Sequence, residues 1–277
     1  MWHVVAHTVN GRWLFRSWPE GLEVWERVWQ AVPDAQAVCV MPDHVHVLAP
    51  SPDRRRLGAA LSGLARWRNH QEGVSGRLVR PLPPAEAVPE GPKRRRSVRY
   101  VHLNPCRARL VADPLAWPLS THRDAVGLTW ERRGPARRRD TFHAYVSSDP
   151  AARVEGTSLP GGALRASPDE VMDAVAAVMR VPRERLGRVP LARRVAGIAL
   201  IELSSMSRRE AAGRLGVSAR TLRRDPPAPR AAVEAVCTVA GDERFQGFDR
   251  HSLLTLGPWQ SYARRRGLSR WGPWRGR

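Results

Sequence analysis

Apolar and polar positions in the first half of the chain follow strand spacing in some segments and helix spacing in others. Residues 4–9 alternate in polarity, and residues 37–40 and 45–49 are short, largely apolar runs, so these three segments are predicted to be strands. Apolar residues recur at helical spacing over 22–32 and again over 57–64, which predicts two amphipathic helices. Strands and helices that alternate in this way, with antiparallel connections, predict an α+β domain.

The segment after the second helix predicts a loop and then a third helix. Residues 76–92 are rich in proline and glycine, as loops are. The basic run Lys93, Arg94, Arg95 and Arg96 leads into a helical segment that contains Tyr100. Pro105 is predicted to end this helix, because a proline disfavours helical backbone in the residue before it.

Composition divides the 277 residues into four segments, and a chain of this length has room for two domains. Residues 1–128 form the predicted α+β domain, and residues 129–165 form a connector. Residues 166–240 are predicted to be an all-α domain, and residues 241–277 a basic tail with several tryptophans. The composition of the connector predicts that cutting near residues 161–162 yields two folded pieces.

The all-α domain contains a pattern typical of a helix-turn-helix motif over residues 207–224. Gly216 occupies the turn, and Leu215 and Leu222 are the predicted core contacts. The second helix of such a motif enters the major groove of DNA with its N-terminus first. The residues predicted to contact DNA are Ser218, Arg220, Thr221, Arg223 and Arg224. The alternative is a pair of helices that only packs into the core.

Charge and composition indicate the kind of molecule that the protein binds and the compartment in which it acts. The chain has 46 Lys and Arg against 26 Asp and Glu, a net charge of +20, which favours an anionic partner and most simply nucleic acid. The longest apolar stretch is too short to span a membrane, and no signal-peptide pattern opens the chain, so we expect a cytoplasmic protein. The three cysteines are isolated and indicate neither a zinc knuckle nor a disulfide framework.

Four polar side chains in the first domain make a candidate nucleic-acid-cutting site. His44 and His46 lie two residues apart, so on a strand both point to one face while Val45 points to the other. Tyr100 and Asn104 lie four residues apart, so on a helix they share a face. Two imidazoles and an amide oxygen could hold a divalent metal beside the tyrosine hydroxyl, a set that suits phosphoryl transfer.

These residues carry a resemblance to a known family. Residues 41–48 resemble the His-hydrophobic-His strand of HUH nucleases, and residues 100–111 resemble the tyrosine helix of single-tyrosine transposases, in particular the REP-associated group. Residues 2–5 and 117–120 are also similar to that group. The resemblance covers residues 1–128. More loosely, the helical domain resembles the DNA-binding domain of the bacterial replication initiator.

The resemblance implies a fold, a reaction and a substrate. The implied fold is a ferredoxin-like antiparallel sheet backed by helices. Tyr100 would attack a phosphodiester and form a 5′-phosphotyrosine, with Mg²⁺ or Mn²⁺ on His44, His46 and Asn104. The implied substrate is single-stranded hairpin DNA, with a second contact to duplex DNA through the helical domain. Apart from the resemblance, the run from Lys93 to Arg96 is either a solvated face of the helix or, next to the nucleophile, a set of phosphate contacts. We expect the protein to associate with the nucleoid.

Other interpretations remain open at this stage. A catalytically silent DNA-binding regulator would keep the fold and lose the site, and a metal-dependent nuclease that uses water would need no covalent tyrosine. Tyr145 falls in the connector and Tyr262 in the tail, so Tyr100 is the only tyrosine expected beside the histidine pair. The sequence leaves open whether the chain forms a homodimer.

Overall fold

The computed structural model describes the chain except for residues 11, 74, 155–165, 247–252, 254–256 and 267–277. Its contacts divide the chain into two compact units, which are residues 1–122 with 251–277, and residues 123–250. The first unit therefore combines the two ends of the chain. No helix in the described part of the chain is both long enough and apolar enough to cross a membrane.

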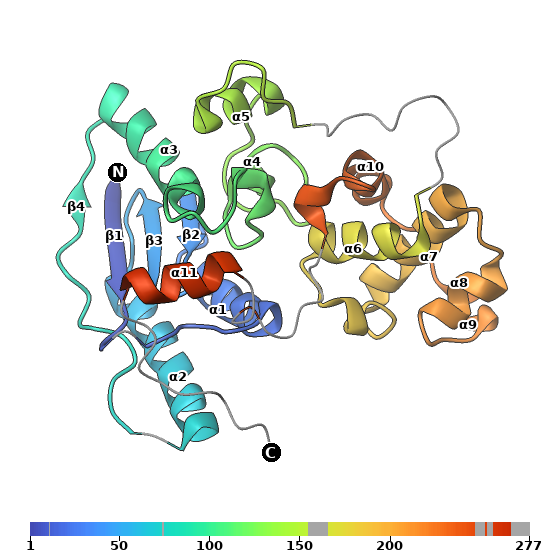
Figure 1. The fold of residues 1–277 in the computed structure, drawn as a ribbon, viewed down its shortest axis with the longest axis horizontal. Helices are drawn as coiled ribbons and strands as arrows, with labels where there is room; N and C mark the ends of the chain where they lie inside the picture. Colours follow the sequence, from blue (N-terminus) through green and yellow to red (C-terminus); the bar gives the residue numbers. More distant parts are fainter. Residues whose placement is uncertain (11, 74, 155–165, 247–252, 254–256, 267–277) are drawn as a thin grey trace. The chain divides into compact units, whose positions relative to one another are not determined.

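A four-stranded antiparallel sheet forms the centre of the first unit (Figure 1). The strands are β1 (Trp2–His7), β2 (Ala37–Val40), β3 (His44–Ala49) and β4 (Glu86–Ala87), in the spatial order β2-β3-β1-β4. Strands β2 and β3 contain only buried residues, which include His44 and His46 of β3. The mixed strand and helix pattern confirms the predicted α+β class.

Three long helices accompany the sheet. They are α1 (Trp18–Ala31), α2 (Arg54–Glu72) and α3 (Pro92–Arg107). Ser17 and Asp53 cap the first two helices by accepting hydrogen bonds from backbone N–H groups of the first turn. Helices α1 and α2 pack on each other, and α3 packs on β2 and β3.

Two local predictions in this unit were wrong. The predicted loop over 76–92 contains β4, which pairs with Trp2 and His3 at the edge of β1. Pro105 does not end the tyrosine helix but lies inside α3, and the basic run forms the first turns of that helix. A proline so close to the end removes only one hydrogen bond, because Ala108 N–H still bonds to the carbonyl of Asn104.

The segment predicted as a tail contains helix α11 (Gly257–Arg266), which belongs to the first unit. Its Trp259 is buried, with its ring centroid 6.1 Å from that of Trp13 and 5.5 Å from that of Trp117. Leu253 N–H, before the helix, donates to the carbonyl of Arg16 at 2.9 Å. This part of the chain is therefore packed into the α+β unit instead of forming a separate tail.

The second unit is helical in the part of it that the structure describes. Its helices are α4 (His122–Ala125), which begins at the unit boundary, α5 (Arg139–Ser147), α6 (Pro168–Met179), α7 (Pro190–Ser204), α8 (Arg208–Arg214), α9 (Ala219–Arg224) and α10 (Arg230–Val239). Helices α6, α7 and α10 pack together through buried valine, alanine and leucine side chains.

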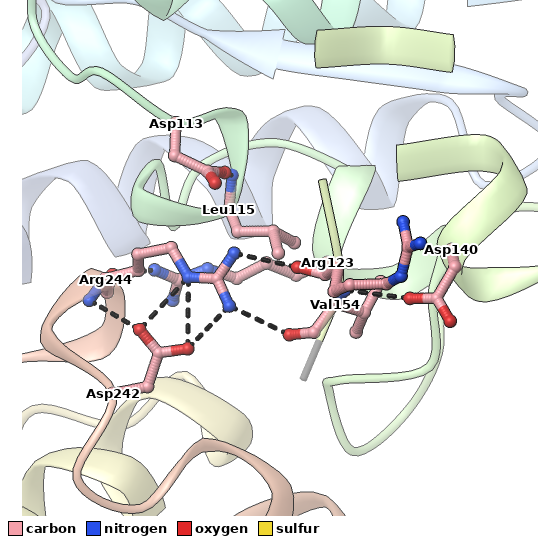
Figure 2. Close-up of polar contacts among 8 residues, drawn as sticks. Asp113, Leu115, Arg123, Asp140, Val154, Asp242 and Arg244 are labelled. Carbon is pink, nitrogen blue, oxygen red and sulfur yellow. Dashed lines mark hydrogen bonds and ion pairs between the residues drawn. The ribbon is translucent and has the colours of Figure 1, made fainter. Parts of the chain in front are cut away.

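An arginine links the predicted connector to this helical unit (Figure 2). Arg244 pairs with Asp242 and donates to the carbonyl oxygens of Arg153 and Val154, at 3.1 and 2.9 Å. The N–H of Val154 donates to Asp140 in α5 at 2.9 Å. The described part of the connector is thus bonded to the unit that follows it, whereas residues 161–162 lie outside the described residues.

Helices α8 and α9 are joined by a short turn at the predicted place. Gly216 in this turn has a φ of +66°, a conformation that suits glycine. Ser207 and Ser218 cap the two helices with their side chains, Ser207 as part of a capping box. Leu222 packs against Gly197 of α7, as a core contact should.

Candidate active site

The two histidines of β3 point to the same face of the sheet, and Asp43 orients the first of them. His44 Nδ1 lies 2.6 Å from Asp43 Oδ1. Because an ionised carboxylate can only accept a hydrogen bond, His44 Nδ1 carries a proton and donates a hydrogen bond to Asp43. In the neutral form of His44 the lone pair is then on Nε2, which is the arrangement that a metal-binding imidazole needs.

His46 joins the strand to the tyrosine helix. Its Nε2 lies 2.8 Å from the amide nitrogen of Asn104, and its Nδ1 lies 3.1 Å from His3 Nε2. Burial, with smaller contributions from His44 and His3, lowers the pKa of His46 to about 2. The ring is consequently neutral at physiological pH, and a neutral imidazole is the form that binds metals.

Tyr100 lies beside this cluster and is open to solvent. Its ring is perpendicular to that of His46, with 5.5 Å between the centroids, and 39% of the residue is exposed. The guanidinium carbon of Arg107 lies 5.0 Å from the centre of the tyrosine ring. The structure thus brings His44, His46, Tyr100 and Asn104 together, as their spacing predicted. Their catalytic and metal-binding roles stay predictions.

Two further histidines belong to this cluster and were not predicted. His3 and His7 lie on β1, opposite Leu48 and His44, on the face that carries the histidine pair. The rings of His7 and His44 are stacked, with 5.2 Å between the centroids. Burial is the main cause that lowers the pKa of both His3 and His7. The alternation of β1 already contained the signal, because residues 3 and 7 share a face.

The prediction that Tyr100 is the only tyrosine near the histidine pair was wrong. The hydroxyl of Tyr262, on α11, donates to Asp43 Oδ1, and Arg266 Nε donates to Asp43 Oδ2 at 2.9 Å. Burial and the neighbouring Asp43 carboxylate raise the pKa of Tyr262 well above its usual range. A buried tyrosine with a raised pKa is a poor nucleophile, so Tyr100 remains the better candidate.

The donors at the site fit a divalent metal, although acidic ligands do not surround it. Among the described residues no group of three or more His, Cys, Asp or Glu side chains is arranged to hold a metal ion. A metal here would rely on His44 Nε2, His46 Nε2 and the amide oxygen of Asn104. The amide nitrogen of Asn104 now faces His46. A rotation of this amide by half a turn would exchange its nitrogen and oxygen and bring the oxygen next to His46.

The residues predicted to contact DNA are exposed or partly exposed. Arg95 and Arg96 are exposed in the first turns of α3, whereas Arg94 pairs with Glu90 and Lys93 with Glu86. On α9, Ser218, Arg220, Arg223 and Arg224 are exposed and Thr221 is half-buried.

Comparisons with known proteins leave the family open. No protein-family model and no curated protein matches the sequence. One solved structure, described as a REP-associated tyrosine transposase bound to a REP hairpin, is 20% identical over 57% of this chain and 92% of its own. The TM-score of 0.33 is too low for this likeness to establish a shared fold or function.

Proposed function

We propose that this protein is a metal-dependent single-strand DNA endonuclease and strand transferase, a transposase of the REP-associated tyrosine type. The observation that carries the proposal is the convergence of His44, His46 and Asn104 on one side of the exposed Tyr100 ring. An exposed nucleophile beside oriented imidazoles is what a phosphodiester-cutting site requires.

The arrangement of strands supports the implied fold. The chain order β1-α1-β2-β3-α2-β4 and the spatial order β2-β3-β1-β4 are those of a ferredoxin-like sheet. In this arrangement β3 is a central strand, and α3 lies over the face of the sheet that carries the histidines. The site is therefore built on regular elements that hold its side chains in place.

In the proposed reaction the hydroxyl oxygen of Tyr100 attacks a phosphorus atom of single-stranded DNA. The new bond joins this oxygen to the 5′-phosphate, and the bond from phosphorus to the 3′-oxygen breaks. The proton that Tyr100 loses is balanced by the one that the leaving 3′-oxygen gains. Because the phosphotyrosine is itself a phosphodiester, a later attack by a 3′-hydroxyl rejoins the strand without ATP.

The remaining site residues would prepare this attack. His44, His46 and Asn104 would hold Mg²⁺ or Mn²⁺, which polarises and orients the scissile phosphate when bound. The exposed guanidinium groups of Arg95 and Arg96, one to two helical turns before Tyr100, would hold neighbouring phosphates. The substrate would be a single strand that folds into a hairpin.

The second unit would add a contact to duplex DNA. Helices α8 and α9 are short, capped and joined by a glycine turn, as a helix-turn-helix motif requires. Ser218, Ala219 and Arg220 at the start of α9 would face the bases, and Arg223 and Arg224 the phosphates. We expect the protein to act on chromosomal DNA in the cytoplasm.

A cleavage assay tests the proposal. The substrates are end-labelled single strands that fold into hairpins, incubated with Mn²⁺. Wild-type protein should cut them and Tyr100→Phe should not, whereas Tyr145→Phe, a change of an exposed tyrosine outside the site, should cut at the wild-type rate. Equal cleavage by Tyr100→Phe would indicate a nuclease that uses water, and no cleavage by wild type would indicate a silent DNA-binding protein.

A further inference from the structure

Helix α11 lies on the first unit through both apolar and polar contacts. Trp259 packs among the rings of Trp13, Trp18 and Trp117, which anchor the helix. On the same helix, Arg265 donates to the carbonyl of Ala108, the residue that follows α3, at 2.6 Å. The helix thus contacts the end of the element that carries Tyr100 and Asn104.

The polar contacts of α11 converge on Asp43, which directly precedes β3. The carboxylate is buried, and both of its oxygens are bonded. Oδ1 accepts from His44 Nδ1 and from the hydroxyl of Tyr262, and Oδ2 accepts from Arg266 Nε. Two of these three side-chain donors therefore come from a helix more than two hundred positions further along the chain.

The hydrogen bonds to the Asp43 carboxylate fix its orientation. Held by donors on both oxygens, it keeps one orientation and fixes the imidazole that donates to it. Without those donors it would turn toward solvent, because a buried charge with unfilled hydrogen bonds is unfavourable. The orientation of Asp43 therefore depends on Tyr262 and Arg266.

We propose that Tyr262 and Arg266 of α11 are positioning residues of the active site, which act through Asp43 to hold His44 with its Nε2 lone pair available to a metal. This inference rests on the proposed function for the metal. It assigns to the C-terminal helix a role in the site of the N-terminal domain. Packing alone does not require these groups, since Trp259 already supplies the apolar anchor and an apolar residue could fill the space of Tyr262.

Metal affinity of the full-length protein tests the proposal without DNA. Asp43→Asn should weaken Mn²⁺ binding about 10-fold or more, the usual loss when a partner of a ligating histidine is removed. Tyr262 and Arg266 contact Asp43 and not His44 itself, so Tyr262→Phe and Arg266→Gln should lower Mn²⁺ affinity by about 3-fold to 10-fold. Their matched controls, Tyr145→Phe and Arg264→Gln, change exposed residues and should bind Mn²⁺ like wild type. Unchanged affinity in Tyr262→Phe and Arg266→Gln would overturn the proposal.

A double-mutant cycle separates positioning from general destabilisation. If Tyr262 acts through Asp43, adding Tyr262→Phe to the Asp43→Asn protein should cause no further loss of affinity. Losses that add would show that Tyr262 affects the site by another route and would refute the mechanism. Thermal unfolding of each variant verifies that the protein measured is folded.

The tautomer of His44 gives a second readout that needs no metal. In wild-type protein, ¹⁵N NMR should show His44 protonated on Nδ1, and in Tyr262→Phe it should show a mixture of the two tautomers. The same tautomer in both proteins would contradict the positioning role. If wild type binds no Mn²⁺, the proposed function fails, and the tautomer measurement still decides whether α11 positions His44.

Discussion

At the scale of single residues, the two histidines of the pair are held in the site in different ways. His46 is surrounded by His3, Asn104 and Tyr100, and its burial keeps the ring uncharged. His44 is oriented by a hydrogen bond instead, because its Nδ1 donates to the carboxylate of Asp43. Desolvation thus lowers the pKa of His46, and a hydrogen bond fixes the orientation of His44.

Loss of the histidine pair should weaken metal binding. In a His44→Ala, His46→Ala double variant two of the three proposed ligands are missing, so Mn²⁺ affinity should fall by at least about 10-fold. Titration calorimetry of the metal-free protein measures the change. His70→Ala, which removes an exposed histidine at the end of α2, is the control. Unchanged binding by the double variant would show that the metal, if bound, lies elsewhere.

The buried histidines should also make the metal-free protein less stable in mild acid. The pKa of His46 is lowered from 6.5 to about 2, and those of His3 and His7 are lowered as well. Below pH 6.5 the unfolded chain therefore binds protons at these histidines that the folded chain does not bind. Their contribution to the free energy of unfolding is fully present above that pH and decreases below it. Asp43, whose pKa is also lowered, adds a loss only below about pH 4.

Chemical denaturation between about pH 4.5 and 7.5, with a chelator present, measures this decline. A single fully shifted histidine contributes a slope of up to about 1.4 kcal/mol per pH unit. His46→Gln should remove up to that much of the slope, and His70→Gln none. An unchanged slope in His46→Gln would mean that His46 is charged in the folded protein.

At the scale of elements, the sequence predicted those whose periodicity is local. Strands β1 to β3, helices α1 and α2, and the pair α8 and α9 lie close to where the apolar spacing and the capping serines place them. The two residues of β4 contain no apolar signal, and they form a strand only because the edge of β1 offers partners. Helix α3 continues past Pro105 since a proline near the end costs one bond.

Helix α9 should contribute a salt-dependent part of DNA binding by the full-length protein. Substituting glutamine at Arg220, Arg223 and Arg224 removes three exposed charges. Since Arg223 and Arg224 are the proposed phosphate contacts, the slope of log K against log salt should become less steep by about 0.9 for each of them. Fluorescence anisotropy with duplex DNA measures the slope.

A second variant controls for the loss of net charge. It carries glutamine at Arg185, Arg188 and Arg230, which are exposed residues outside α8 and α9. This variant should keep more of the wild-type slope than the α9 variant. Equal slopes in the two variants would reject the helix-turn-helix assignment and favour two helices that only pack.

At the scale of the whole molecule, what could not be predicted is the association of distant segments. The proximity of Tyr100 to the histidine pair followed from two local spacings and a family resemblance. The contact of Tyr262 with Asp43 follows from neither, because it depends on how α11 packs. Trp259 and Tyr262, three residues apart, indicate an apolar face on this helix, but a sequence does not show which surface such a face will cover.

This packing changes the expected result of cutting the chain. A protease site placed between residues 161 and 162 should still yield two folded pieces. The pieces should remain associated after cleavage, because α11 is part of the C-terminal piece but packs within the first unit. Size-exclusion chromatography measures the association. Trp259→Ala should weaken it, and Trp67→Ala, which removes an exposed tryptophan, should not.

The covalent intermediate tests the central claim most directly. Wild-type protein mixed with a hairpin single strand and Mn²⁺ should form a protein–DNA adduct that survives denaturation. Peptide mass analysis should place the DNA on Tyr100 through its 5′-phosphate. Tyr262→Phe, at saturating Mn²⁺, should form the same adduct, and Tyr100→Phe should form none. An adduct on Tyr262, or normal cleavage by Tyr100→Phe with no adduct, would contradict the proposed mechanism.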